Sequence, residues 1–453
     1  MKESERKKSS HQNSKVLLRK WNRDLPIADR ASGSYVFDRE GKKYLDASGG
    51  AYVVNVGHAI PEINDAIKKQ LDRYSYVNGN QFANDASEEL AEKLIARAPK
   101  GFSRVSFLSS GSEGVEAALK FARQYYFDRG EKGRGKIISR KPGYHGNTML
   151  ALSVSGRPRY QAYFAPLMLP AIQVPGPMEY RCPVDFQNEG ADYYLSFIEK
   201  AIKKAGPDEI LAVIIEPVGG SSTGGQVSPP GYHKKLRELC TRHGIMLIAD
   251  EVLCGCGRTG EFYASMLDDL NPDIIVLGKG VNGGYVPLSA VLFREEHVEV
   301  LRAKSGHFMH QQTYMMHPLG CAAGLAVINY IDSKNLLQNA RENGAYLKEK
   351  LLKEILPHKN VGHIGGIGML YGIDLVADKK TAEPFAAKDK IYDTFAMHAQ
   401  DSEGLIVWPN SGHVGDDRGD MICIAPALNI SKREIDELVE KFSRALKSFE
   451  KFL

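Results

Sequence analysis

Short apolar runs alternate with amphipathic segments from about residue 85 to residue 330, and no other feature constrains the fold of this chain as strongly. The apolar runs have the length of buried strands and lie at 104–108, 211–215, 244–250 and 273–277. Strands that are apolar on both faces and alternate with helices are typical of a parallel sheet covered on both sides. The sequence therefore predicts an α/β fold.

Two of the intervening segments have helical spacing. The first, 113–127, places four small or apolar side chains on one face, which are Val115, Ala118, Leu119 and Ala122. The second, 230–243, has Pro230 near its start, where a helix tolerates proline best. Both segments are expected to cover the sheet.

The two ends of the chain carry further local signals. Residues 33–46 are expected to form a β-hairpin with Glu40 and Gly41 in its turn. Segment 431–449 is expected to be a closing amphipathic helix, capped by Ser431 and Glu434. The first fifteen residues are rich in Lys, Ser and Glu, and we expect a partly mobile arm, 1–15.

Polar residues close or follow several of the predicted strands, namely Ser110, Glu216, Asp250 and Lys279. In parallel sheets, ligands bind at the carboxyl ends of the strands. This shared position predicts that the four side chains line one site.

Asp250 and Lys279 have the chemistry that pyridoxal phosphate requires. A lysine forms a Schiff base with this cofactor, and a carboxylate keeps its pyridine nitrogen protonated. Taken singly, an aspartate at a strand end caps a turn, and a lysine in a glycine-rich turn is solvated. The neighbours of the pair favour the cofactor, because Gly280 and the glycines of 282–284 let the backbone fold tightly around a ring.

Two more segments fit the same cofactor. Residues 109–113, Ser-Ser-Gly-Ser-Glu, link a strand to a helix, whose unpaired N–H groups suit a phosphate. A plain capping box is the alternative there. Tyr144 stands between two glycines and could stack on a flat ring, with Val252 on the opposite ring face. Ordinary packing of a turn tyrosine is the alternative.

Together these motifs resemble the class III aminotransferases. The resemblance is carried by 110–118, 144–146, 216–218, 250–260 and 277–285, and it extends over about residues 30 to 445. It implies the fold-type I architecture of aspartate aminotransferase, with a mainly parallel sheet in a large domain and a small α+β domain. The limits implied are 61–330 for the large domain, and 16–60 with 331–453 for the small one.

The resemblance also implies roles for individual residues. Lys279 resembles the Schiff-base lysine and Asp250 the partner of the pyridinium nitrogen. The other cofactor contacts implied are Gly111, Ser112, Tyr144, His145, Glu216, Val252 and Thr313. Of these, Thr313 resembles a threonine that reaches the phosphate in the neighbouring subunit. A homodimer or a tetramer, with active sites at the subunit interface, is therefore expected.

Departures from the family pattern narrow the range of expected substrates. Ornithine and 4-aminobutyrate aminotransferases carry an arginine where this chain has Cys423, and that arginine binds an α-carboxylate. The run at 254–260, Cys-Gly-Cys-Gly-Arg-Thr-Gly, and an aromatic residue at Tyr52 are closer to the ω-amine:pyruvate and β-alanine:pyruvate branch. We expect ping-pong transfer of an amino group from an amine or ω-amino acid to a keto acid such as pyruvate.

The carboxylate of that keto acid needs a partner. Arg418, in a loop rich in Gly and Asp, lies near the position of the mobile arginine of the ω-branch. The alternative is a solvated arginine paired with Asp416 or Asp417.

The same motifs are compatible with other reactions and with another acceptor. Racemases, aminomutases and decarboxylases of class III share Lys279 and Asp250, and 2-oxoglutarate could replace pyruvate as acceptor. A nucleotide-binding α/β protein is disfavoured, because no Gly-x-Gly-x-x-Gly follows the first strand.

Composition excludes several other classes. A net charge of +4 in 453 residues gives no warrant for nucleic-acid binding. No apolar run is long enough to span a bilayer, and no secretory signal is visible, so a cytoplasmic enzyme without membrane contact is expected. Six cysteines form no disulfide framework, and Cys254 and Cys256 lack metal-ligand spacing, so no metal is expected.

Overall fold

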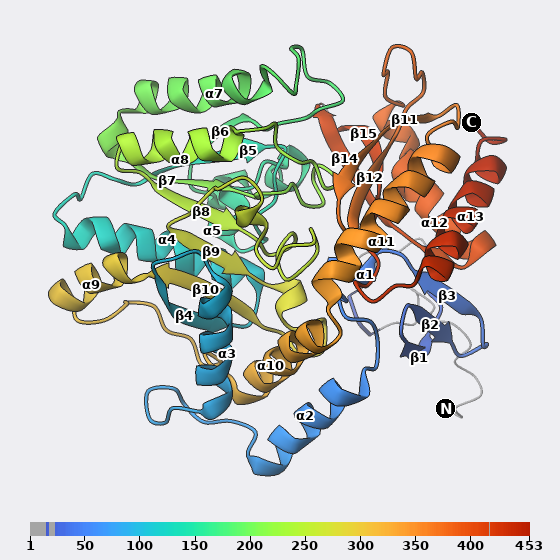
Figure 1. Ribbon diagram of the computed structural model, residues 1–453. Helices are drawn as coiled ribbons and strands as arrows, with labels where there is room; N and C mark the ends of the chain where they lie inside the picture. The colour runs from blue at the N-terminus through green and yellow to red at the C-terminus, as the bar shows by residue number, and fades with distance from the viewer. Residues whose placement is uncertain (1–14, 18–22, 416) are drawn as a thin grey trace.

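A computed structural model describes residues 15–17, 23–415 and 417–453. The expected mobile arm, 1–15, lies almost wholly outside these ranges. Three sheets organise the described chain (Figure 1).

The central sheet has seven strands, and six of them run in the same direction. In spatial order they are β4 (Phe102–Leu108), β10 (Ser289–Arg294), β9 (Ile274–Leu277), β8 (Met246–Asp250), β7 (Ile210–Ile215), β5 (Lys136–Lys141) and β6 (Ile172–Pro175). Only β10 is antiparallel to its neighbours among these strands. The predicted α/β fold with a mainly parallel sheet is confirmed.

Helices cover both faces of this sheet, which is why its middle strands are apolar throughout. Every residue of β7 and β8 is buried. Val213 and Ile215 pack with α3 (Asp85–Arg97), α7 (Gly190–Ala205), α8 (Tyr232–Arg242) and α10 (Pro318–Ser333). Ala212 and Ile214 pack with α4 (Gly111–Asp128), α5 (Met149–Ser153) and α9 (Glu295–Lys304). Figure 1 shows α7 and α8 together over one face.

The predicted helices differ from the observed ones only at their ends. The four residues expected on one face of 113–127 are all buried in α4. Helix α8 begins at Tyr232, two residues later than predicted from Pro230. The reason is Gly231, whose φ of 75° is left-handed and cannot continue a right-handed helix.

Two smaller sheets lie beside the central one (Figure 1). One contains β1 (Ala28–Ser32), β2 (Tyr35–Asp38), β3 (Lys43–Asp46) and β13 (Leu405–Ile406). The other is antiparallel and contains β11 (Val361–Ile367), β12 (Leu370–Leu375), β15 (Arg418–Ile424) and β14 (Trp408–Gly415). The predicted hairpin is β2–β3, with Gly41 at a φ of 82° in its turn.

The helices near these sheets share their core, and they are α11 (Leu336–Lys350), α12 (Ile391–Glu403) and α13 (Lys432–Phe449). Helix α13 begins with the predicted capping box, in which Ser431 and Glu434 each satisfy the backbone of the other. The remaining helices are α1 (Gly49–Tyr52), α2 (Pro61–Arg73) and α6 (Pro158–Gln161). Helix α10 packs against both α2 and α3. The domain limits at 60/61 and 330/331 remain a proposal.

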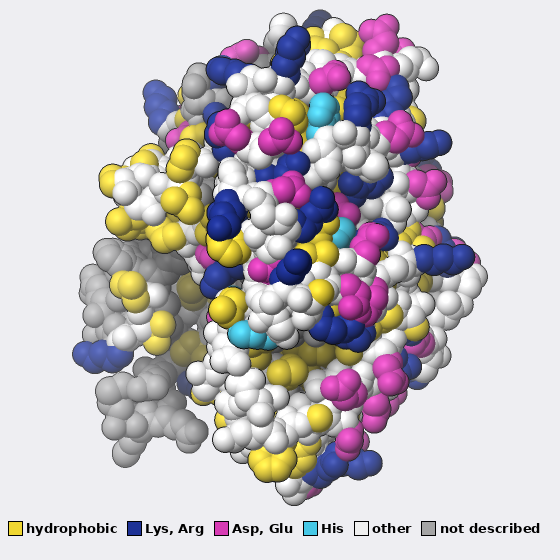
Figure 2. Space-filling model, turned by 90° about the vertical axis from the view of Figure 1, so that its left-hand side faces the viewer, with side chains coloured by type: hydrophobic (Ala, Val, Ile, Leu, Met, Phe, Trp, Pro, Cys, Tyr) yellow, Lys and Arg dark blue, Asp and Glu magenta, His cyan; other side chains and the backbone are white. Residues whose placement is uncertain are grey.

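In Figure 2, Lys and Arg side chains are interspersed with Asp and Glu over the centre and right of the face shown. No helix of the described residues has the length and apolarity needed to cross a membrane.

Candidate active site

Four strands of the central sheet deliver polar residues to one edge. Strands β4, β7, β8 and β9 run in parallel, so their carboxyl ends lie at the same edge of the sheet. Ser110, Glu216, Asp250 and Lys279 stand at or just after those ends, as the sequence predicted. This edge is the candidate active site.

Asp250 is a buried carboxylate with ordered partners. Its Oδ2 lies 2.7 Å from Nδ1 of His145, and its Oδ1 accepts a hydrogen bond from the Val252 N–H at 3.0 Å. Asp250 and His145 are each 3% exposed. The aspartate is therefore held in one orientation, and it can oppose a positive charge placed against it.

Lys279 follows β9 in a tight turn and has a left-handed backbone, with a φ of 42°. Burial lowers the pKa of its ammonium, while the carboxylates of Asp250 and Glu216 act in the opposite direction. A lysine with a lowered pKa supplies more neutral amine, which is the nucleophilic form.

Glu216 lies between Asp250 and the Tyr144 loop. Its carboxylate accepts hydrogen bonds from the N–H groups of Tyr144 at 3.3 Å and Gly220 at 3.0 Å. Burial raises its pKa and the charge of Asp250 adds to this, whereas His145 and Arg140 oppose it. The Arg140 guanidinium donates to the main-chain carbonyl of Glu216 rather than to its carboxylate.

The start of α4 forms a small cradle. Ser110 caps the helix through its Oγ, which accepts from the Glu113 N–H at 3.3 Å. The Glu113 carboxylate accepts from Ser109 N–H, one residue before the position of a reciprocal capping box. A Cβ on Gly111 would lie 2.8 Å from a methyl of Val252, so only glycine fits without displacement there.

Ser112 completes this cradle, and its Oγ accepts a hydrogen bond from the Asn147 N–H at 3.1 Å. Val252 also lies close to Gly278, where an added Cβ would be 3.1 Å from one of its methyls. The first N–H groups of a helix have no partner within the helix, so this cradle fits a phosphate group.

An aromatic group with one arginine lies next to Glu216. The Arg157 guanidinium carbon is 5.5 Å from the centroid of the Tyr144 ring. Tyr52 is buried at 2% exposed, has a φ of 64°, and lies 5.5 Å from Trp408 between ring centroids. Cys423 is fully buried in the same apolar cluster as Tyr52. Neither Arg157 nor Trp408 was predicted from the sequence.

Two predicted residues lie apart from this group. Arg418 is 41% exposed in its side chain, and its Nη1 is 3.3 Å from the Glu383 carboxylate. Its partner is therefore Glu383 rather than Asp417, and Asp416 lies outside the described residues. Thr313 is exposed, and its carbonyl accepts from the Tyr76 hydroxyl at 2.8 Å.

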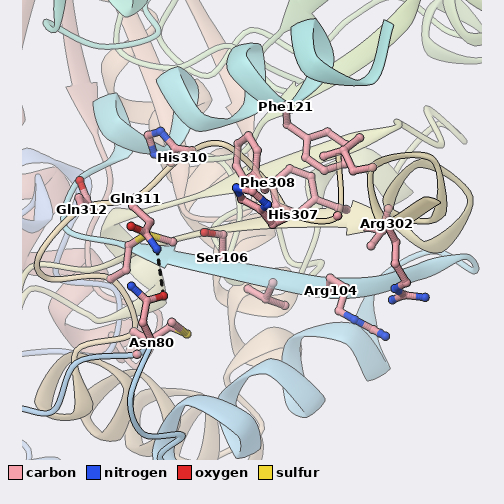
Figure 3. Close-up of a pocket in the computed structure, with 18 of the residues that line it drawn as sticks. Asn80, Arg104, Ser106, Phe121, Arg302, His307, Phe308, His310, Gln311 and Gln312 are labelled. Carbon is pink, nitrogen blue, oxygen red and sulfur yellow. Dashed lines mark hydrogen bonds between the residues drawn. The ribbon is translucent and has the colours of Figure 1, made fainter. Parts of the chain in front are cut away.

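The loop that carries Thr313 borders a cavity of about 680 Å³ (Figure 3). Its walls come from β4, α4, β10, α9 and the loops 78–80 and 306–316, and the Gln311 amide donates to Asn80 at 2.9 Å across it. Lys279 and Asp250 are not among its lining residues. The cavity is thus separate from the candidate active site.

Asn55 joins the loops of the site, and this role was not predicted from the sequence. Its Nδ2 donates to the carbonyls of Cys256 and Gly280, each at 3.0 Å. Arg258, 1% exposed, donates to the carbonyls of Met369 and Pro426. These bonds tie the loops after β8 and β9 to the neighbouring sheets.

Comparison with known proteins identifies the family. A model of the family described as "Aminotransferase class-III" matches residues 19–446. The chain belongs to the class III aminotransferases. The enzyme is therefore a transaminase of fold-type I that uses pyridoxal phosphate, as the sequence motifs predicted.

The names of similar proteins indicate different activities. This aminotransferase is 36% identical to the uncharacterised aminotransferase YodT of Bacillus subtilis, over 94% of this chain and 96% of that protein. It is 33% identical to an adenosylmethionine-8-amino-7-oxononanoate aminotransferase of Geobacter sulfurreducens, over 95% and 94%. An (S)-enantioselective ω-transaminase from Thermomicrobium roseum has a TM-score of 0.90 and 33% identity, over 97% of each chain.

Proposed function

We propose that this aminotransferase moves an amino group from an amine or ω-amino acid to a keto acid, with pyruvate as the acceptor, by a ping-pong mechanism. The observation that carries this proposal is the fully buried Cys423 beside Tyr52, at the position where the α-carboxylate-binding enzymes have an arginine. No arginine forms an ion pair with the Glu216 carboxylate in the described part of the chain. The likeness to an ω-transaminase structure supports the same branch.

The residues of the site would hold pyridoxal phosphate as follows. The helix start at Gly111 and Ser112 would take the phosphate, and Tyr144 and Val252 would contact the two faces of the ring. Asp250, oriented by His145, would face the ring nitrogen. When bound, the cofactor supplies the electron sink that makes the substrate carbon acidic.

Lys279 has two tasks in this proposal. As a neutral amine it would bond covalently to the cofactor aldehyde, and once released it would accept the proton from the substrate carbon. Its lowered pKa favours the neutral form that both tasks need. Asp250 would face the ring nitrogen in a fixed orientation, because its Oδ2 contacts His145 and its Oδ1 accepts from the Val252 N–H.

A homodimer is part of the proposal. Thr313 is exposed and is one of the residues that line the 680 Å³ cavity, so it can reach a second chain. Exposed apolar side chains accompany it on the same loop, with Met309 at 66% and Tyr314 at 59%. We propose that a second copy covers this face and receives Thr313 at its phosphate site.

The proposal is tested with purified holoenzyme and a panel of amines and ω-amino acids, each offered with pyruvate and with 2-oxoglutarate. We expect parallel-line kinetics with an ω-type donor and pyruvate. Racemisation or decarboxylation of an amino acid without transfer to either acceptor would instead support a rival class III reaction. If the amino group were transferred faster to 2-oxoglutarate than to pyruvate, the proposed acceptor would be 2-oxoglutarate.

Lys279→Ala tests the site itself. We expect loss of the visible absorbance of lysine-bound cofactor and a fall in turnover of at least about 10⁴-fold. Lys304→Ala, an exposed lysine at the end of α9, is the matched control and should keep both. Transamination by Lys279→Ala at wild-type rate would remove Lys279 from the mechanism.

A further inference from the structure

We infer that Arg157 is the residue that binds the carboxylate of the keto acid, and that it does so from a fixed position. The inference rests on the proposed function for the identity of the acceptor. Arg157 follows α5 and precedes α6, and its guanidinium stands 5.5 Å from the ring of Tyr144. It is thus placed beside the ring that we propose to stack on the cofactor.

The Arg157 side chain is anchored by neutral groups from two other parts of the chain. Its Nε donates to Ser222 Oγ at 2.9 Å, and its Nη2 donates to Ser221 Oγ at 3.4 Å and to Asn410 Oδ1. Ser222 and Asn410 are 2% and 3% exposed, so the anchors themselves are buried. Three anchoring contacts hold the planar guanidinium in one orientation.

Within the described part of the chain, the charge of Arg157 has no counter-ion, because no carboxylate there lies within ion-pair distance of its guanidinium. No described residue accepts a hydrogen bond from its Nη1 either. A half-buried cation held only by neutral acceptors is costly unless a bound anion compensates it, and a planar guanidinium fits a carboxylate best.

A second donor lies nearby. The Tyr52 hydroxyl is buried beside the Cys423 thiol, and no oxygen or nitrogen of a described residue lies within hydrogen-bond distance of it. Burial raises the pKa of this phenol and the neighbouring Cys423 adds to the rise, while the Arg157 charge acts against it. The phenol therefore stays protonated and can donate. Arg157 Nη1 and Tyr52 Oη together offer a carboxylate two donors of the required kind.

Arg418 provides a contrast. Its side chain lies at the surface in an ion pair with Glu383, and the hydrogen bond between them is 3.3 Å long. To bind a substrate it would have to leave that pair and move inward. Arg157 needs no such movement, because its anchors hold its guanidinium 5.5 Å from the Tyr144 ring. A fixed cation also explains how this enzyme can lack an arginine at position 423.

The test is direct binding of a carboxylate that cannot react. Propionate has the carboxylate of pyruvate without the keto group, and propionamide is its neutral isostere. Calorimetric titration of the holoenzyme should give binding of propionate and much weaker binding of propionamide. In Arg157→Leu the affinity for propionate should fall on the order of a hundredfold, because the charge-assisted bonds are lost.

Three further variants separate the explanations. Arg157→Lys keeps the charge without the planar fork and should bind propionate with intermediate affinity. Tyr52→Phe should lower the affinity for propionate by several-fold and leave the affinity for propionamide unchanged. Arg418→Leu should bind propionate like the wild type. In each variant, cofactor absorbance and the half-reaction with an uncharged amine report whether the site is intact.

Wild-type affinity for propionate in Arg157→Leu would overturn the inference. The inference would also be overturned if only Arg418→Leu lost propionate binding, or if the wild type bound propionate and propionamide equally well. If pyruvate failed as an acceptor while propionate binding depended on Arg157, the proposed acceptor would be wrong and the carboxylate site would stand.

Discussion

At the scale of single residues, two side chains of the site stand on backbone that most residues avoid. Lys279 and Tyr52 both have a positive φ, 42° and 64°, although neither is a glycine. A left-handed conformation costs roughly 1–2 kcal/mol in a residue with a Cβ, so the surrounding contacts must enforce it. The orientation of both side chains is therefore set by main-chain geometry as well as by packing.

Glu251 makes the stability of the enzyme depend on pH. It is 1% exposed, and its carboxylate accepts from the N–H groups of Ala264 and Ser265. Burial raises its pKa from the ordinary 4.5 to about 7. The folded chain therefore binds this proton more tightly than the unfolded chain. Its contribution to stability is fully present below about pH 4.5 and is lost as the pH rises through 7.

We expect Glu251→Gln to lose less stability between pH 5 and pH 8 than the wild type, by on the order of 3 kcal/mol. Calorimetric melting of the holoenzyme at both pH values measures the difference. Glu238→Gln, at an exposed position of α8, should leave the pH dependence unchanged. If the stability of wild type and Glu251→Gln depended on pH in the same way, Glu251 would not be the source of the pH dependence.

Some residues of the site could be predicted and others could not. Asp250 and Lys279 stand beside apolar strands and glycine-rich turns, so the local sequence indicates their position. Arg157 has no such signal, because its anchors Ser221, Ser222 and Asn410 are 64, 65 and 253 positions away. Only the folded chain shows that this arginine has no carboxylate partner among the residues that the structure describes.

At the scale of elements, the start of α4 is the part of the phosphate cradle that packing defines most sharply. A methyl group on Gly111 would meet two carbons of Val252 at 2.8 and 3.0 Å. We expect Gly111→Ala to weaken cofactor binding by about tenfold or more, since the helix start must shift to relieve this contact. Titration of the apoenzyme with pyridoxal phosphate measures the dissociation constant.

The matched control is Gly135→Ala, because an added Cβ at Gly135 meets nothing within 4 Å. Its cofactor affinity should equal that of the wild type. Unchanged affinity in Gly111→Ala would show that the phosphate does not lie at this helix start.

The elements themselves were largely predictable because burial and local pattern agree. Strands β7 and β8 are apolar on both faces, and α4 and α13 have one apolar stripe and a capping residue. The start of α8 was missed, since Pro230 is tolerated in a first turn while the left-handed Gly231 comes after it. Backbone handedness at one glycine is not visible in hydrophobic spacing.

At the scale of the whole molecule, the proposed dimer predicts that the two chains complement each other. If Thr313 serves the partner's site, a hybrid of Lys279→Ala and Thr313→Asp chains contains one doubly altered site and one intact site. Refolding an equal mixture should then recover about a quarter of wild-type activity, since half of the dimers are hybrids.

Each variant refolded alone is the control for this experiment and should be nearly inactive. A mixture no more active than its separate components would place Thr313 in its own chain's site, or outside the site altogether. Sedimentation of the same samples confirms that dimers have formed.

The hydrogen bonds of Asn55 have a consequence for how the chain is made. Its side chain holds the carbonyls of Cys256 and Gly280, and its own carbonyl accepts from the Leu428 N–H at 2.7 Å. A residue translated early thus depends on partners translated much later. Contacts of such long sequence separation form late. On the ribosome, the nascent chain can shape its central sheet, but its cofactor pocket closes only after Leu428 has emerged.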